Sequence, residues 1–157
     1  HNVKIMNAEF LHELLQNVIM RQFDINLDQV FFVGQSGGAI FLSEIFVPLF
    51  ANQYRGGAIM LCGGEAPGVD ATKIGDGFKR LFKIHFQTTA NELAELQPMI
   101  QRGFAAYSAL VNNRDFVTLE NVGDGDHCVF PLSAEPKTIA PIILRMMDQN
   151  RTVQSSG

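Results

Sequence analysis

The stretch VFFVGQSGGAIFLSE, from Val30 to Glu44, places a serine between glycines at the junction of two apolar segments. The short apolar run 30–33 is rich in β-formers and predicts a strand, whereas the residues after Gly37 predict a helix. A serine on a sharp turn from a strand into a helix is the G-x-S-x-G pattern of a nucleophile elbow. We therefore interpret Ser36 as a nucleophile. The alternative is a glycine-rich turn in which Ser36 only caps the helix.

This turn needs small residues at Gly34 and Gly38, because it brings them close together. It exposes the Ser36 hydroxyl above the sheet, and the N–H of Gly37 begins the helix, where free N–H groups and the helix dipole favour an anion. We expect Gly37 to donate to the oxyanion of an acyl-transfer intermediate. Gln35 is expected to line the acyl pocket or simply to fill the turn.

A nucleophilic serine needs a base and an orienting acid, which follow in the order serine, acid, histidine on this kind of sheet. His127 lies in the stretch GDGDHC, directly after the last predicted strand. His1 is terminal, His12 precedes Ser36 on a predicted helix, and His85 lies inside a predicted strand. His127 is therefore the predicted base, with a solvated turn histidine as the alternative.

The acid is expected after the third predicted strand, where the sequence HFQTTANELAEL offers Glu92. Glu92 is the predicted acid, although a carboxylate in the first turn of a helix is also stabilised by the dipole alone. Asp124 and Asp126 are predicted to form the turn before His127. Asp126 is the reserve candidate for the acid.

Predicted strands and helices alternate along the chain, which indicates an α/β fold with a mostly parallel sheet between two helical layers. Asn7 is the predicted cap of the first helix, Pro48 is expected to bend or shorten the second, and Pro98 to interrupt the third or delay its start. The predicted segments are helix 7–23, strand 29–34, helix 37–53, strand 56–64, loop 65–77, strand 81–89, helix 91–111, strand 115–122, turn 123–128, helix 136–150 and a frayed tail 151–157.

The first predicted strand has the continuous apolar character of a central strand that is buried on both faces. Only three predicted strands follow it, so its other edge needs a neighbour. We expect strands before His1, or a partner chain, to supply that neighbour.

Composition restricts the classes of function. The chain has 157 residues, 46% of them hydrophobic, which suits one globular domain. A net charge of −4 with scattered Lys and Arg argues against nucleic-acid binding. No apolar run is long enough to span a bilayer.

The two cysteines, Cys62 and Cys128, form no disulfide framework and lack the spacing of a metal site. They are either free thiols or one bridge, and a bridge would indicate an oxidising compartment, extracellular or periplasmic. Both lie near the carboxyl ends of strands, where a bridge would fix the histidine loop.

Taken with FDINLDQVFFVGQSGG, these features resemble the α/β-hydrolase superfamily, and within it the esterases related to polyhydroxybutyrate depolymerases and feruloyl esterases. The resemblance extends from about Asn7 to Asn150 and is most specific at the elbow and at GDGDHC. It implies a small ester substrate and no metal or organic cofactor. The implied triad is Ser36, His127 and Glu92, with Gly37 in the oxyanion hole.

Two features depart from that family. Its acid is usually Asp, and its first strands and the loop with the second oxyanion donor have no counterpart here. The resemblance thus implies that residues 1–157 form a single, partial α/β-hydrolase domain. A serine peptidase or acyltransferase would use the same triad. A protein of another class, a non-catalytic binding or assembly module, would keep the fold without the activity.

Overall fold

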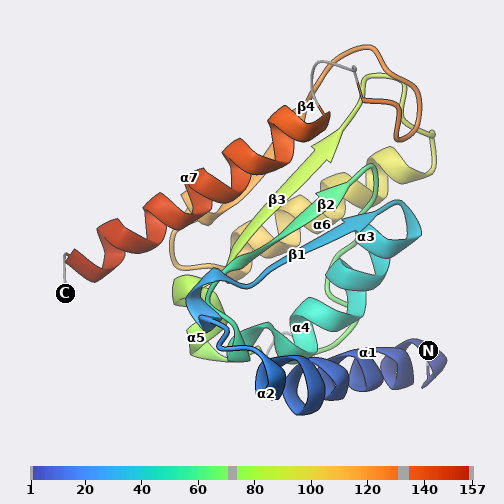
Figure 1. The fold of residues 1–157 in the computed structure, drawn as a ribbon. Helices are drawn as coiled ribbons and strands as arrows, with labels where there is room; N and C mark the ends of the chain where they lie inside the picture. Colours follow the sequence, from blue (N-terminus) through green and yellow to red (C-terminus); the bar gives the residue numbers. More distant parts are fainter. Residues whose placement is uncertain (1, 71–73, 131–134, 156–157) are drawn as a thin grey trace.

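A parallel sheet of four strands organises the computed structural model, which describes residues 2–70, 74–130 and 135–155 (Figure 1). The strand order is β1-β2-β3-β4, and each neighbouring pair is parallel. The predicted α/β class with a parallel sheet is therefore confirmed. The strands are β1 (Phe31–Gln35), β2 (Gly57–Leu61), β3 (Lys83–Thr88) and β4 (Val117–Asn121).

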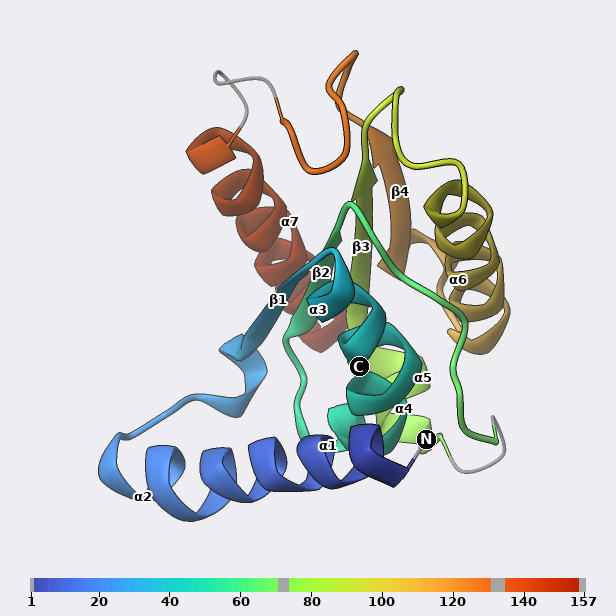
Figure 2. The same ribbon diagram turned by 90° about the vertical axis from the view of Figure 1, so that its right-hand side faces the viewer.

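Helices cover both faces of this sheet, with α7 (Glu135–Ser155) on one side and α3 (Gly37–Phe41) and α6 (Leu96–Leu110) on the other (Figure 2). The alternation of side chains along each strand separates two apolar cores. Met60 and Phe86 face α3 and α6, whereas Ile59 packs against α7.

The remaining helical segments connect or flank the strands, and no helix among the described residues is long and apolar enough to cross a membrane. They are α1 (Asn2–Leu14), η1 (Leu15–Ile19), α2 (Met20–Gln22), η2 (Leu27–Gln29), η3 (Leu42–Phe46), α4 (Val47–Phe50), η4 (Ala51–Gln53), α5 (Asp76–Leu81) and η6 (Arg114–Phe116).

The helix after the elbow continues through residues 37–53, as predicted, but changes its hydrogen-bond spacing one turn before Pro48. Proline has no N–H to donate to the carbonyl four residues earlier, which is that of Glu44. That carbonyl accepts instead from the N–H of Gly68 at 2.7 Å. The π-helical turn η3 is the local consequence, so Pro48 distorts the helix without ending it.

The first helix begins earlier than predicted, at Asn2, and Asn7 is not its cap. Ala8 is wholly buried and Ile5 packs against the core, so tertiary packing extends the helix toward the N-terminus. Its opposite face is apolar but exposed, with Met6 64% and Phe10 69% accessible.

Helix α5 lies at the end of the predicted loop 65–77, of which residues 71–73 are outside the described part of the chain. No residue of its own caps α5. The side chain of Asn52 does so from a distance by accepting from the N–H of Phe78 at 3.2 Å.

The delayed start expected for the third helix is confirmed, whereas the end of the last helix differs from the prediction. Helix α6 starts late, at Leu96, which places Pro98 in its first turn, where proline needs no acceptor. The last helix includes Pro141 and runs to Ser155, so the predicted frayed tail is wrong for 151–155; residues 156–157 are not described. The sequence contains no glycine or proline between Pro141 and Gly157 that would end the helix earlier.

Strand β1 lies at the edge of the described sheet, so its predicted central position, which depends on a further neighbouring strand, stays a prediction. No strand pairs with its outer edge within the described ranges, and Val33 is 47% exposed. Phe31, which lies on the same face of β1 as Val33, packs against the apolar cluster under α7, so this face is only partly covered.

Candidate active site

Ser36 lies on a strained turn at the carboxyl end of β1. Its φ of 50° and ψ of −118° lie outside the regions that ordinary side chains prefer. A Cβ on Gly34 would come within 2.6 Å of the Gly38 carbonyl oxygen, and one on Gly63 within 2.5 Å of the Ser36 carbonyl oxygen. Glycine therefore permits the close approach of three backbone segments on which this turn depends.

His127 joins Ser36 to Glu92. Its Nε2 lies 3.0 Å from the Ser36 Oγ, and its Nδ1 is hydrogen-bonded to the Glu92 Oε1. An ionised carboxylate only accepts, so Nδ1 carries the proton and Nε2 accepts from the serine hydroxyl. The structure thus brings together the three residues that the sequence singled out, in the geometry of a nucleophile, a base and an orienting acid.

The carboxylate of Glu92 is fully buried, whereas the His127 side chain is 25% exposed. The Glu92 Oε1 also accepts from the N–H of Leu93 at 2.9 Å, which fixes the carboxylate behind the imidazole. A negative charge on the Nδ1 side would stabilise an imidazolium if Nε2 took up a proton.

Backbone contacts align the loop that carries Glu92 with the loop that carries His127. Asn91 pairs with Asp126 in an isolated parallel bridge, and its side chain donates to the Asp124 carbonyl at 2.9 Å. Thr89 donates to the Asp126 carbonyl at 3.2 Å. These contacts use the backbone of Asp124 and Asp126, whose side chains point to solvent, so the reserve acid Asp126 does not take the place of Glu92.

A disulfide joins Cys62, directly after β2, to Cys128, directly after His127, with 5.2 Å between their Cα atoms. Of the two interpretations that the sequence left open, the structure contains the bridge. Ser36, Cys62 and Cys128 are the non-glycine residues with positive φ in the described part of the chain, and all three lie at this site. Strained backbone is concentrated where Ser36, His127 and Glu92 meet, as is common at functional sites.

Polar contacts around Glu65 hold the segment that follows β2, next to Ser36. Glu65 forms an ion pair with Arg102 of α6, and its N–H donates to the Ser43 Oγ at 2.8 Å. Burial acts to raise the pKa of Glu65, but the hydrogen bonds from Arg102 and Ala66 outweigh it, so the pKa is lowered. The sequence offered no signal for these contacts, because their partners lie on separate elements.

Gln35 and Gly37 flank the serine and are both exposed. The N–H of Gly37 is the first of α3 and belongs to the group of N–H donors that have no acceptor within a helix. Gln35 is the last residue of β1. Their expected roles in the oxyanion hole and the acyl pocket stay predictions.

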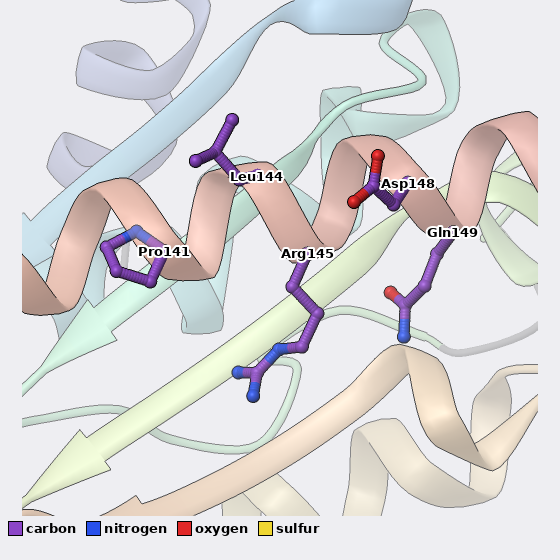
Figure 3. Close-up of a pocket in the computed structure, with 5 residues that line it drawn as sticks. All are labelled: Pro141, Leu144, Arg145, Asp148 and Gln149. Atoms are coloured by element: carbon purple, nitrogen blue, oxygen red, sulfur yellow. The ribbon is translucent and has the colours of Figure 1, made fainter.

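A pocket of about 580 Å³ opens elsewhere, on the outward face of α7 (Figure 3). Arg145 and Gln149 point to one side of the helix there, and Leu144 to the other. No triad residue lines this pocket, and its side chains include no nucleophile. We assign it no part in the chemistry.

Cys62, His127 and Cys128 offer metal-ligand atoms that all lie within 4.8 Å of one another. Both sulfurs are bonded to each other in the disulfide of this structure.

The chain matches no protein-family model and no curated protein. The function proposed below therefore depends on the residues of this chain alone.

Proposed function

We propose that this protein is a serine hydrolase that cleaves carboxylic esters through an acyl-enzyme. The observation that carries the proposal is the continuous hydrogen-bond chain from Glu92 through His127 to Ser36, on a strained strand-to-helix turn. Each residue type suits its role, and the chain order of serine, acid and histidine is that of hydrolases built on parallel sheets. The esterase-like sequence around the elbow favours an ester over an amide substrate.

In the first half-reaction the Ser36 Oγ attacks the ester carbonyl carbon while the His127 Nε2 takes the hydroxyl proton. The carbonyl oxygen becomes an oxyanion, to which the N–H of Gly37 donates. His127 then returns the proton to the leaving alcohol, and the acyl group stays on Ser36. Water, deprotonated by His127, releases the acid and restores the serine.

The second oxyanion donor and the acyl pocket are not assigned among the described residues. The unpaired outer edge of β1 and the exposed Val33 support the expectation that a further segment or a partner chain extends the sheet there. In this proposal the fold is that of an α/β-hydrolase, and the extension supplies the missing donor.

The disulfide supports the proposal that the enzyme acts in an oxidising compartment, because thiols stay reduced in the cytosol. It closes a separation of 66 residues and ties the histidine loop to the end of β2. In the proposed enzyme the bridge positions His127 without taking part in the reaction.

Covalent labelling tests this function. We expect a fluorophosphonate to modify Ser36, since an activated hydroxyl is required, and p-nitrophenyl acetate to be hydrolysed. We expect Ser36→Ala to abolish both the labelling and the hydrolysis. Ser108→Ala is the matched control, because the Ser108 hydroxyl is buried without a hydrogen-bond partner in the described structure. Absence of labelling both in the folded, disulfide-bonded chain and in that chain together with the segment or partner that extends β1 would overturn the proposal in favour of a non-catalytic binding module.

A further inference from the structure

The two cysteine sulfurs and the His127 ring nitrogen offer metal-ligand atoms within 4.8 Å of one another, although the sulfurs are bonded to each other in this structure. Zinc in proteins takes Cys sulfur at about 2.3 Å and His nitrogen at about 2.0–2.1 Å in a tetrahedral arrangement. Those bond lengths require about 3.5 Å between a sulfur and a nitrogen ligand. The Cys128 Sγ lies 3.4 Å from the His127 Nε2, so this pair already has the required separation.

The distance between the two sulfur atoms must change most for zinc to bind. Tetrahedral geometry places two zinc-bound sulfurs about 3.8 Å apart, which is close to their non-bonded contact distance. Reduction of the disulfide allows that separation through rotation of the two side chains. The Cα atoms of Cys62 and Cys128, 5.2 Å apart, do not have to move far.

The buried carboxylate supplies the second layer that zinc-bound histidines usually have. Such a histidine commonly donates its other ring N–H to a carboxylate, which fixes the tautomer and makes the ligating nitrogen more basic. Glu92 already accepts from the His127 Nδ1 and leaves Nε2 to bind a cation. The pair formed by Glu92 and His127 therefore matches the carboxylate–histidine arrangement found at zinc sites, in which the carboxylate orients the histidine ligand.

An oxygen ligand is available for the fourth position. The Ser36 Oγ lies 3.0 Å from the His127 Nε2, somewhat closer than the separation of about 3.3 Å between oxygen and nitrogen ligands of zinc. Either this hydroxyl or a water molecule would complete the tetrahedron. Two cysteines, one histidine and an exchangeable fourth ligand form a known type of zinc site.

We propose that the reduced form of this chain binds one Zn²⁺ through Cys62, Cys128 and His127. A dithiol reductant donates two electrons, is itself oxidised to a disulfide, and leaves two thiols on the protein. Zinc binding then releases both thiol protons. The metal occupies the Nε2 lone pair that would deprotonate Ser36, so it inhibits the hydrolase. This inhibition rests on the proposed function, whereas metal binding does not.

The test titrates the folded chain, oxidised or reduced with a phosphine, with Co²⁺ as an optical probe and with Zn²⁺ in competition with a chromogenic chelator. We expect one ion per reduced chain, thiolate-to-cobalt absorption, and a higher melting temperature with zinc that a chelator reverses. The oxidised chain should bind at least tenfold more weakly. Glu92→Gln should weaken binding by about 10- to 100-fold, as loss of an outer carboxylate usually does.

Glu95→Gln provides the matched control, because Glu95 is an exposed carboxylate near Glu92 and its loss should leave the affinity unchanged. The proposal is overturned if the oxidised and reduced chains bind alike, if His127→Gln does not reduce the affinity, or if Glu92→Gln has no effect. Unchanged zinc affinity in Glu92→Gln would also indicate that an unfolded chain binds the metal, because only the folded chain holds Glu92 against His127. Failure of the hydrolase proposal is separate, because it is measured on the oxidised, metal-free chain.

Discussion

Two histidines, His85 and His127, show how differently the interior of the sheet and its carboxyl end use the same side chain. His85 lies in the middle of β3, is fully buried, and is hydrogen-bonded through Nδ1 to the Thr118 Oγ1 of β4 at 2.8 Å. His127 lies in the loop after β4 and is 25% exposed. Each ring has an oxygen partner at Nδ1, but of the two only His127 also has a hydroxyl, that of Ser36, at Nε2.

The difference comes from what surrounds each ring. Burial and the nearby charge of Arg145 lower the pKa of His85 to about 4, so this ring is neutral at neutral pH. A side-chain hydrogen bond with Gln87 acts in the opposite direction but is outweighed, and the His85 Nε2 lies 4.0 Å from the Glu120 carboxylate. His127 instead lies between a buried carboxylate and a hydroxyl. Loops at the strand ends can combine groups from three elements, whereas a strand offers its side chains only to its neighbours.

Exchanging each histidine for glutamine separates the two regions most sharply. We expect His127→Gln to lower kcat by about 10⁴-fold or more, because the general base of a triad is lost. His85→Gln should change kcat by less than about tenfold, since its ring touches no triad residue. Ester hydrolysis, with melting temperatures as the control for folding, measures both. Equal losses of kcat in the two variants would contradict a catalytic role that His127 has and His85 lacks.

Removal of the disulfide tests whether the carboxyl end depends on covalent support. The chain-entropy model assigns about 4 kcal/mol to a bridge that closes a loop of this length. We expect Cys62→Ala/Cys128→Ala to lower the free energy of unfolding by about that amount and to reduce activity as the His127 loop loosens. Urea unfolding of the oxidised protein and the double variant measures the difference. Full activity in a folded double variant would show that hydrogen bonds alone position His127.

The pH dependence of stability examines the sheet interior. His85 has an ordinary pKa of 6.5 when unfolded and about 4 when folded, so the unfolded chain takes up the proton first as the pH falls. The free energy of unfolding should thus decrease between pH 6.5 and pH 4, by about 3 kcal/mol from this group. Urea unfolding at several pH values measures the slope. His85→Gln should be less pH-dependent over this interval, and an identical slope in both proteins would contradict the assignment.

The smallest expected effect concerns the glycines of the elbow. Gly34→Ala places a Cβ 2.6 Å from the Gly38 carbonyl oxygen and should destabilise the protein by about 1–3 kcal/mol. Gly37→Ala meets nothing within 4 Å, so stability should change by no more than about 0.5 kcal/mol. Thermal unfolding of the two variants compares them directly. A destabilisation of Gly37→Ala as large as that of Gly34→Ala would disprove the close-approach argument.

The sequence predicted best what local patterns specify. Apolar runs located all four strands, and glycines around Ser36 located the turn between β1 and α3. It failed where a distant side chain decides the outcome. Helix α5 is capped by Asn52, and Ala8 and Ile5 extend α1 through packing. A local pattern contains no information about such partners.

The candidate site shows the same division. The residue types and their order along the chain were sufficient to select Ser36, Glu92 and His127 and to predict a parallel α/β sheet. Only the tertiary structure decided that Glu92 rather than Asp126 reaches the ring, that Cys62 and Cys128 are bonded, and that β1 pairs with β2 alone among the described strands. The reason is that order and spacing reflect the backbone's local preferences. Hydrogen bonds between the 89–92 and 123–128 loops depend on how separate strands align in register.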